Sequence, residues 1–88
     1  MSERLTRIRA ALAQLQPAQL ELIDESHKHV GHEGARDGRG HFRVRLVAAQ
    51  FDGLPALARH RLVYAALGDL MQTDIHALAI DARAPQEV

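Results

Sequence analysis

The stretch that decides the fold is residues 51–80, which read FDGLPALARHRLVYAALGDLMQTDIHALAI. Pro55 suits the first turn of a helix, because its fixed φ is already helical and its missing N–H would have no partner there. The apolar residues that follow recur at the spacing of one buried helix face: Val63, Ala66, Leu67 and Leu70. The polar segment 72–74 interrupts this pattern, and residues 75–80 form a short apolar run. The stretch therefore predicts one long amphipathic helix, a turn and a buried strand.

Three elements are predicted before this stretch. A helix over residues 2–15 is stopped by Pro17, and its buried stripe consists of Leu5, Ile8, Leu12 and Leu15. Strands are predicted over residues 20–24 and 41–47. In the second strand three apolar residues alternate with Arg43 and Arg45. This alternation indicates a sheet that helices cover on one face while water contacts the other.

The order α-β-β-α-β predicts a two-layer α+β sandwich with a three-stranded mixed sheet. The two early strands are joined by a loop and pair antiparallel, whereas the crossover through the long helix sets the last strand parallel to the second. We expect a single domain over residues 1–88 with an ordered core of about residues 2–83. The tail after Arg83 is expected to be frayed.

The composition is that of a globular domain and excludes several classes. Acidic and basic residues balance at 11 each, so no global field attracts nucleic acid or an anionic membrane. No apolar run approaches the ~18 residues of a membrane span, and no signal peptide is visible, which favours a cytoplasmic location. No nucleophile elbow, P-loop or dinucleotide fingerprint indicates an enzyme. The absence of cysteine excludes disulfides and thiolate ligands from this chain.

Six histidines are the main compositional anomaly. His27, His29 and His32 lie in the polar loop between the two early strands. Imidazole is a good ligand for Zn, Cu, Fe and Ni, so this spacing is compatible with a metal clamp. The alternative is a solvated loop whose histidines have no specific role.

The histidines of the predicted helix and strand have different expected environments. His76 shares strand parity with Leu78 and Ile80, so it is expected to point to the same face as those residues. It is either a ligand or a partly buried histidine that bonds a backbone carbonyl. His60 lies on the buried stripe of the long helix, and we expect a core histidine that donates to a backbone group.

Several strings resemble the signature of the BolA-like proteins. They are FDGL at residues 51–54, RHRLVY at 59–64 and IHALAI at 75–80, together with ESHKH at 25–29 and HFRV at 41–44. The similarity covers nearly the whole chain and implies a class II KH-like fold. It also implies an adaptor that pairs with a monothiol glutaredoxin, with glutathione, and shares a [2Fe–2S] cluster in iron–sulfur trafficking or iron and redox regulation.

The same resemblance implies the ligands. The histidine of the IHAL string, here His76, is the expected cluster ligand in the family. A second ligand comes from the loop between the first two strands, as a cysteine or a histidine. This chain has no cysteine and so resembles the histidine subfamily. His29 is the best match, and His27 and His32 are rivals.

DNA binding is the alternative function, because BolA-like proteins have been regarded as DNA-binding regulators. Arg43 and Arg45 on the open sheet face, with Arg59 and Arg61 on the helix, form a candidate basic patch. The sequence offers too few aromatic residues for a stacking platform. A G-x-x-G string at residues 31–34 lies between strands rather than between helices, as a KH clamp requires. We therefore expect only weak, salt-sensitive DNA binding; a homodimer is also possible.

Overall fold

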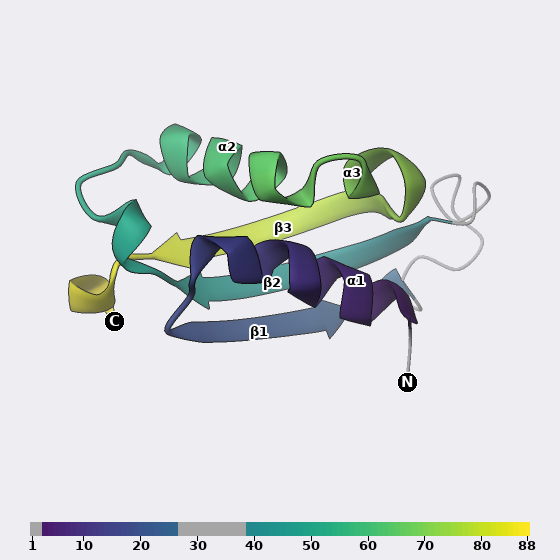
Figure 1. The fold of residues 1–88 in the computed structure, drawn as a ribbon, viewed down its shortest axis with the longest axis horizontal. Helices are drawn as coiled ribbons and strands as arrows, with labels where there is room; N and C mark the ends of the chain where they lie inside the picture. Colours follow the sequence, from purple (N-terminus) through teal and green to yellow (C-terminus); the bar gives the residue numbers. More distant parts are fainter. Residues whose placement is uncertain (1–2, 27–38) are drawn as a thin grey trace.

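The computed structural model of the protein describes residues 3–26 and 39–88 (Figure 1). Its helices and strands follow in the order α1 (Glu3–Leu12), β1 (Gln19–Asp24), β2 (Gly40–Val47), α2 (Ala56–Leu67), α3 (Leu70–Thr73) and β3 (Ile75–Arg83). Short 3₁₀ turns lie at Ala13–Leu15, Ala49–Phe51 and Pro85–Glu87. The predicted α-β-β-α-β order is confirmed, with α3 as a short addition before the last strand.

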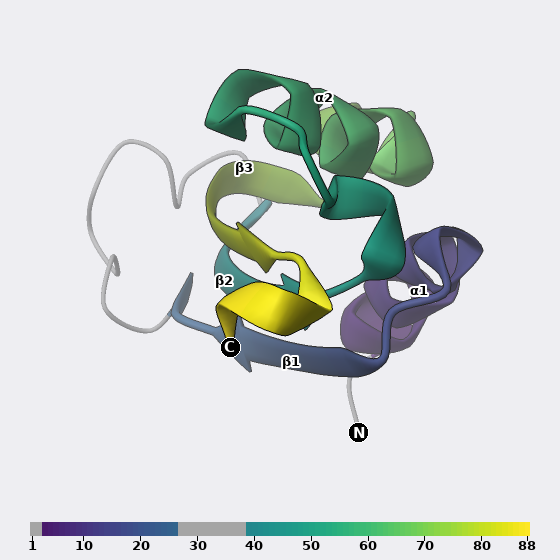
Figure 2. The same ribbon diagram turned by 90° about the vertical axis from the view of Figure 1, so that its left-hand side faces the viewer.

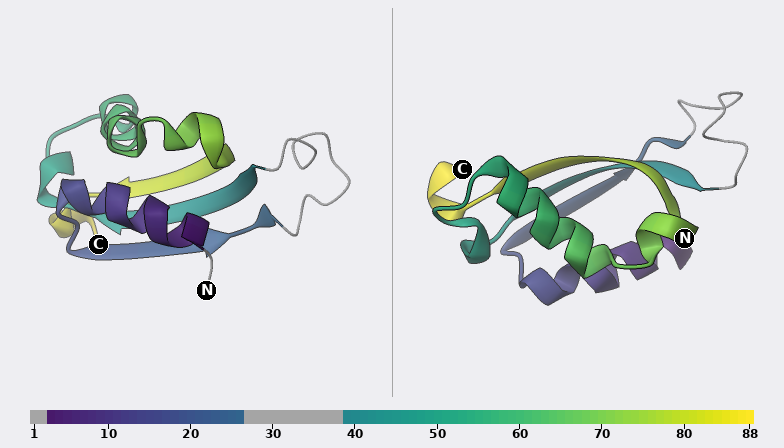
Figure 3. Two further views of the ribbon diagram at one scale, coloured as in Figure 1. Left: turned by 45° about the vertical axis from the view of Figure 1, so that its right-hand side comes forward. Right: turned by 90° about the horizontal axis from the view of Figure 1, so that it is seen from above.

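The sheet has the strand order β1-β2-β3, with β1 antiparallel and β3 parallel to the central strand. Helices α1 and α2 lie on the same face of this sheet, and within residues 3–26 and 39–88 no helix covers its other face (Figure 2, Figure 3). The structure is therefore the predicted two-layer α+β sandwich with a three-stranded mixed sheet. A class II KH-like description is compatible with this topology.

The core lies between the sheet and the two long helices. Strand β2 contributes every second residue, since Phe42, Val44 and Leu46 are buried while Arg43 and Arg45 are exposed. The side chains that face them from α1 and α2 are also buried: Ile8, Leu12, Val63 and Leu67. Burying an aliphatic or phenyl side chain of this size stabilises a fold by about 1.5–3 kcal/mol. The predicted apolar stripes thus provide the packing of the sandwich.

The long helix ends earlier than predicted. We expected one helix through Leu70, but α2 ends at Leu67 and Gly68 adopts a positive φ of 53°. The chain leaves the helix at this residue, and glycine adopts a positive φ without the steric cost of a Cβ. The N–H of Gly68 still donates to the carbonyl oxygen of Tyr64 at 2.9 Å. Across residues 3–26 and 39–88, none of the helices has the length and apolar character needed to cross a membrane.

The C-terminal end is more ordered than predicted. Strand β3 continues to Arg83, three residues beyond the expected run, because its pairing with β2 continues to Val47. Ala84 is buried and the following residues form the turn Pro85–Glu87. The carboxylate of Glu87 accepts two hydrogen bonds from the guanidinium of Arg59, at 2.6 and 2.8 Å. The frayed tail that we expected is therefore replaced by a turn fixed to α2.

Candidate metal-ligand site

A β-bulge defines the position of His76. Gly40 pairs with Ile75 and the next residue of β2, His41, pairs with Ala77, so His76 is the extra residue between two paired positions. Ile75 is fully buried and His76 is exposed. The parity prediction, which placed His76 on the same face as Leu78 and Ile80, is wrong. One inserted residue reverses the alternation of faces at this end of the strand.

The bulge brings His76 close to His41. The centroids of the two imidazole rings are 5.2 Å apart, and the ring planes are inclined by 51°. Two imidazoles on one tetrahedral ion, with metal–nitrogen bonds of about 2.0–2.1 Å, have their centroids about 5 Å apart. The separation of the two rings is compatible with a shared metal centre, and it is also an ordinary separation for two packed rings. Sequence analysis missed His41 as a site residue; its signal is its position at the start of the strand that pairs with β3.

His41 is fixed by the end of β1. Its backbone N–H donates to the hydroxyl oxygen of Ser26 at 3.0 Å, and its carbonyl oxygen accepts the N–H of Glu25 at 2.7 Å. The residue is half-buried, and its Nε2 atom is buried. Gly40 is buried beside it, and a Cβ built on Gly40 would lie 2.6 Å from the ring of Phe42. The backbone at the start of β2 is therefore held closely against its neighbours.

An ion-pair cluster fixes the start of β3. The carboxylate of Asp74 is buried and accepts hydrogen bonds from Arg7 at 2.5 Å and from the hydroxyl of Thr73 at 2.6 Å. The hydrogen bond from Thr73, and then that from Arg7, lowers the pKa of Asp74. The carbonyl oxygen of Asp74 accepts the N–H of Gly40 at 2.9 Å. One residue thus ties α1 and β2 to the segment that carries His76.

Arg39 lies directly against the ring of His76. Its Nη2 atom is 3.2 Å from Nδ1 of His76, and its Nη1 atom donates to the carbonyl oxygen of Met71 at 3.4 Å. The side chain therefore spans from α3 to the bulge. Arg39 precedes the predicted strand over residues 41–47, and no sequence motif marks it as a site residue.

The loop histidines His27, His29 and His32 lie outside the described residues. The chain leaves the described part after Ser26 and returns at Arg39, and both residues contact the His41–His76 end of the sheet. Within residues 3–26 and 39–88, no group of three or more histidine, aspartate or glutamate side chains forms a metal site. The described chain therefore supplies two imidazoles at this end.

His60 does not belong to this arrangement. It is half-buried on α2, and it has no hydrogen-bond partner in the part of the chain that the structure describes. The predicted donation to a backbone group is therefore wrong. In contrast, its neighbour Arg59 is a structural residue, since it donates to the carbonyl oxygens of Leu54 and Ala82 at 2.8 and 3.0 Å as well as to Glu87.

The four candidate arginines do not form one basic patch. Arg45 lies between Glu21 and Asp81 on the open sheet face, at 3.7 and 3.8 Å. Arg43 pairs with Glu25 at 3.4 Å. Arg59 and Arg61 lie on α2 in the helical layer, where Arg61 is exposed and Arg59 pairs with Glu87. Neighbouring carboxylates thus neutralise three of the four charges.

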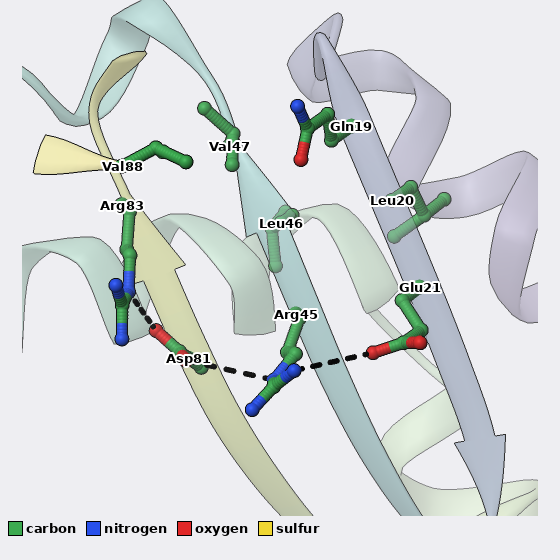
Figure 4. A pocket seen from close by; sticks show the side chains of 9 residues that line it. All are labelled: Gln19, Leu20, Glu21, Arg45, Leu46, Val47, Asp81, Arg83 and Val88. Carbon is green, nitrogen blue, oxygen red and sulfur yellow. Dashed lines mark hydrogen bonds and ion pairs between the residues drawn. The ribbon is translucent and has the colours of Figure 1, made fainter. Parts of the chain in front are cut away.

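A hollow of about 480 Å³ lies where β1 begins and β2 and β3 end, whereas His76 lies at the start of β3. Figure 4 shows the side chains that line this hollow. Its lining comes from all three strands and the C-terminus: Gln19, Leu20, Glu21, Arg45, Leu46, Val47, Asp81, Arg83 and Val88. Arg83 pairs with Asp81 at 2.9 Å, and Arg45 lies between Asp81 and Glu21. The charges in the hollow therefore balance one another, and it contains no imidazole.

Comparison with known proteins assigns the chain to a family. Residues 12–87 match the BolA-like protein family. The chain is 47% identical to BolA-like protein 1 of Bos taurus over 81 residues, and 40% identical to the DNA-binding transcriptional regulator BolA of Escherichia coli over 74 residues. The solved BolA domain of SufE1 from Arabidopsis thaliana superimposes with a TM-score of 0.87 at 40% identity, and the match covers 100% of this chain and 99% of that one.

The curated relatives are longer than this chain. The matched part covers 91% of the chain and 58% of the bovine protein, and 84% of the chain and 65% of the bacterial one. Family membership therefore rests on the domain itself: the match over residues 12–87, the shared fold and the IHAL string that carries His76. This chain belongs to the BolA-like protein family.

Proposed function

We propose that this protein is an adaptor that binds a [2Fe–2S] cluster jointly with a monothiol glutaredoxin, with His76 as its principal ligand. The observation that carries the proposal is the pair of imidazoles, His41 and His76, at one end of the sheet with centroids 5.2 Å apart. His76 is exposed, so a partner protein has access to it. The ion pairs of Asp74 and the pairing of β2 with β3 fix the backbone next to His76.

The donor set agrees with a shared cluster. A [2Fe–2S] cluster takes four ligands from protein, and this chain has no cysteine. Two imidazoles from this protein leave two positions, which the thiolates of a glutaredoxin and of glutathione would fill. Neutral imidazole in place of thiolate raises the reduction potential of such a cluster. The residues of this chain would hold one side of the cluster, and exchange of the partner would allow its transfer.

The second ligand is proposed from two sources. The family resemblance favours a loop histidine, with His29 ahead of His27 and His32. The geometry favours His41, whose ring already lies beside that of His76. A strand residue is the more rigid ligand, because pairing with β1 and β3 fixes its backbone. Substitution of each histidine separates these alternatives.

The test is reconstitution of the complex with a monothiol glutaredoxin and glutathione, monitored by visible circular dichroism. His76→Ala should abolish the cluster signal, whereas His60→Ala, which changes a histidine of α2, should preserve it. His41→Ala should weaken the signal strongly if His41 is the second ligand, and His29→Ala should do so if the loop provides it. A His76→Ala complex with the wild-type spectrum would exclude His76 as a ligand.

DNA binding is a second candidate, favoured by the name of the Escherichia coli relative, a DNA-binding transcriptional regulator. The carboxylate partners of Arg43, Arg45 and Arg59 argue against tight phosphate contacts. We expect no specific site tighter than about micromolar at physiological salt. Gel-shift titration of the wild type against an Arg43→Ala/Arg45→Ala variant tests this. A nanomolar, sequence-selective complex that the double substitution weakens would reverse the order of the two candidates.

A further inference from the structure

We propose that Arg39 gates His76: its guanidinium occupies the Nδ1 lone pair of the ring and so prevents the isolated protein from binding free divalent cations there. This inference rests on the proposed role of His76 as a ligand, and it assigns a regulation to that site. The contact that carries it joins Nη2 of Arg39 to Nδ1 of His76 at 3.2 Å. Arg39 is a positioning residue in this scheme, because it acts through His76.

The contact with Arg39 determines which ring nitrogen of His76 carries the proton. A guanidinium has only N–H donors and no acceptor, so Nδ1 of His76 must be the acceptor of this contact. In the neutral ring the proton then lies on Nε2. A cation at Nδ1 would have to displace Arg39. A cation at Nε2 would require the ring proton to be on Nδ1. The N–H at Nδ1 would then face the N–H of Arg39, and two donors cannot form a hydrogen bond. Binding at either nitrogen therefore requires Arg39 to move.

The positive charge of Arg39 also acts on any ion that binds the ring of His76. Arg39 carries a positive charge, and its guanidinium lies close to any ion on the ring. A free divalent cation is repelled by this charge. A cluster whose iron charge is balanced by sulfide and by partner thiolates carries much less net positive charge, and it is repelled correspondingly less. Arg39 thus distinguishes a stray cation from a thiolate-ligated cluster by charge.

The position of Arg39 supports a movable gate. Its Nη1 atom donates to the carbonyl oxygen of Met71 in a long hydrogen bond of 3.4 Å. The side chain is half-exposed rather than enclosed in the core. The residue adjoins residues 27–38, the segment that contains the loop histidines. A change of the Arg39 side-chain rotamer would break its contact with Nδ1 of His76 while β2 and β3 stay paired.

The test uses the isolated protein and Co²⁺ alone. Isothermal titration calorimetry should give about tenfold tighter Co²⁺ binding for Arg39→Ala than for the wild type, a change of about 1.4 kcal/mol. Arg39→Lys should stay within about twofold of the wild type, because lysine keeps the charge and a donor. Arg83→Ala is the matched control: it removes an exposed arginine from the other end of β3, and it should leave the affinity unchanged.

A second variant tests whether the increase in Co²⁺ affinity depends on His76. His76→Ala in the Arg39→Ala background should return Co²⁺ binding to the wild-type level, whatever the loop histidines contribute. The ring itself gives an independent readout: long-range ¹H–¹⁵N spectra at pH 8 should show the Nε2–H tautomer of His76 in the wild type and a mixture in Arg39→Ala. Thermal unfolding of each variant checks that the fold is intact.

Three results would contradict the proposed role of Arg39. They are unchanged Co²⁺ affinity in Arg39→Ala, an equal increase in affinity in Arg39→Lys, and an increase that persists when His76 is replaced by alanine. None of these measurements uses glutaredoxin or a cluster. If cluster reconstitution fails but Arg39→Ala binds Co²⁺ more tightly, the proposed function is rejected while the proposed role of Arg39 is retained. A normal cluster with no effect of Arg39 would reject the gate alone.

Discussion

Asp74→Asn should destabilise the fold although it hardly changes the size of the side chain. The Asp74 side chain is 8% exposed and pairs with Arg7, whose side chain is 49% exposed, while Arg4 lies 3.4 Å away. The asparagine has almost the same shape but no charge, so Arg4 and Arg7 lose the carboxylate of Asp74, and Arg7 keeps only the exposed Glu3 at 3.9 Å. The change leaves the backbone hydrogen bond from Gly40 to residue 74 in place. It therefore isolates the ionic part of the link between α1 and β3.

The expected cost lies between two known limits. Breaking a fully buried ion pair costs about 3–5 kcal/mol, and an exposed pair contributes only about 0.2–1 kcal/mol. The buried carboxylate and the half-exposed Arg7 place this pair between them, at about 2 kcal/mol. In a domain of this size each kcal/mol lowers Tm by about 4–8 °C, so we expect a decrease of roughly 8–16 °C.

Thermal unfolding by far-ultraviolet circular dichroism measures this change, and Asp69→Asn is the control. Asp69 is exposed in the turn before α3, so its substitution should change the stability by less than about 0.5 kcal/mol. The pKa of Asp74 is lowered in the folded state, so its contribution is present above the unfolded value of 3.8 and is lost as the pH falls through the folded value. The difference between wild type and variant should therefore shrink in acid. Equal Tm values for Asp74→Asn and Asp69→Asn near neutral pH would refute the reasoning.

Two further predictions concern the core and the C-terminal turn. Leu67→Ala should cost about 2–5 kcal/mol, because Leu67 is 3% exposed where α2 packs on the sheet; a loss below about 1 kcal/mol in urea unfolding would show that this helix face is not tightly packed. The hydrogen bonds from Arg59, and then from the N–H of Ala84, lower the pKa of Glu87 from 4.5 to about 2. The stability that this pair contributes should be complete above pH 4.5 and disappear as the pH falls through 2. Glu87→Gln should therefore flatten the decrease in Tm between these pH values, and an identical pH profile in the variant would contradict the role of the pair.

Local pattern was sufficient for most of the architecture. The alternation of Phe42, Val44 and Leu46 with two arginines predicted which face of β2 is buried, because adjacent strand residues point to opposite faces. The stripe that includes Val63 and Leu67 predicted the packing side of α2. The early end of α2 was also readable, since a glycine at position 68 is a common helix terminator. The strings that resemble BolA-like proteins predicted the family, which the match over residues 12–87 confirms.

The sequence by itself determined the elements, their buried faces and the residue types available for chemistry: histidines without cysteine. The tertiary structure decided which of these residues meet. The exposure of His76 depends on a bulge, and a bulge is a mismatch between two strands that the period of either strand cannot reveal. The approach of His41 and Arg39 to His76 likewise follows from the register of β2 on β3. Register is a relation between segments 35 residues apart, as Gly40 and Ile75 are, so it is set by packing and not by local pattern.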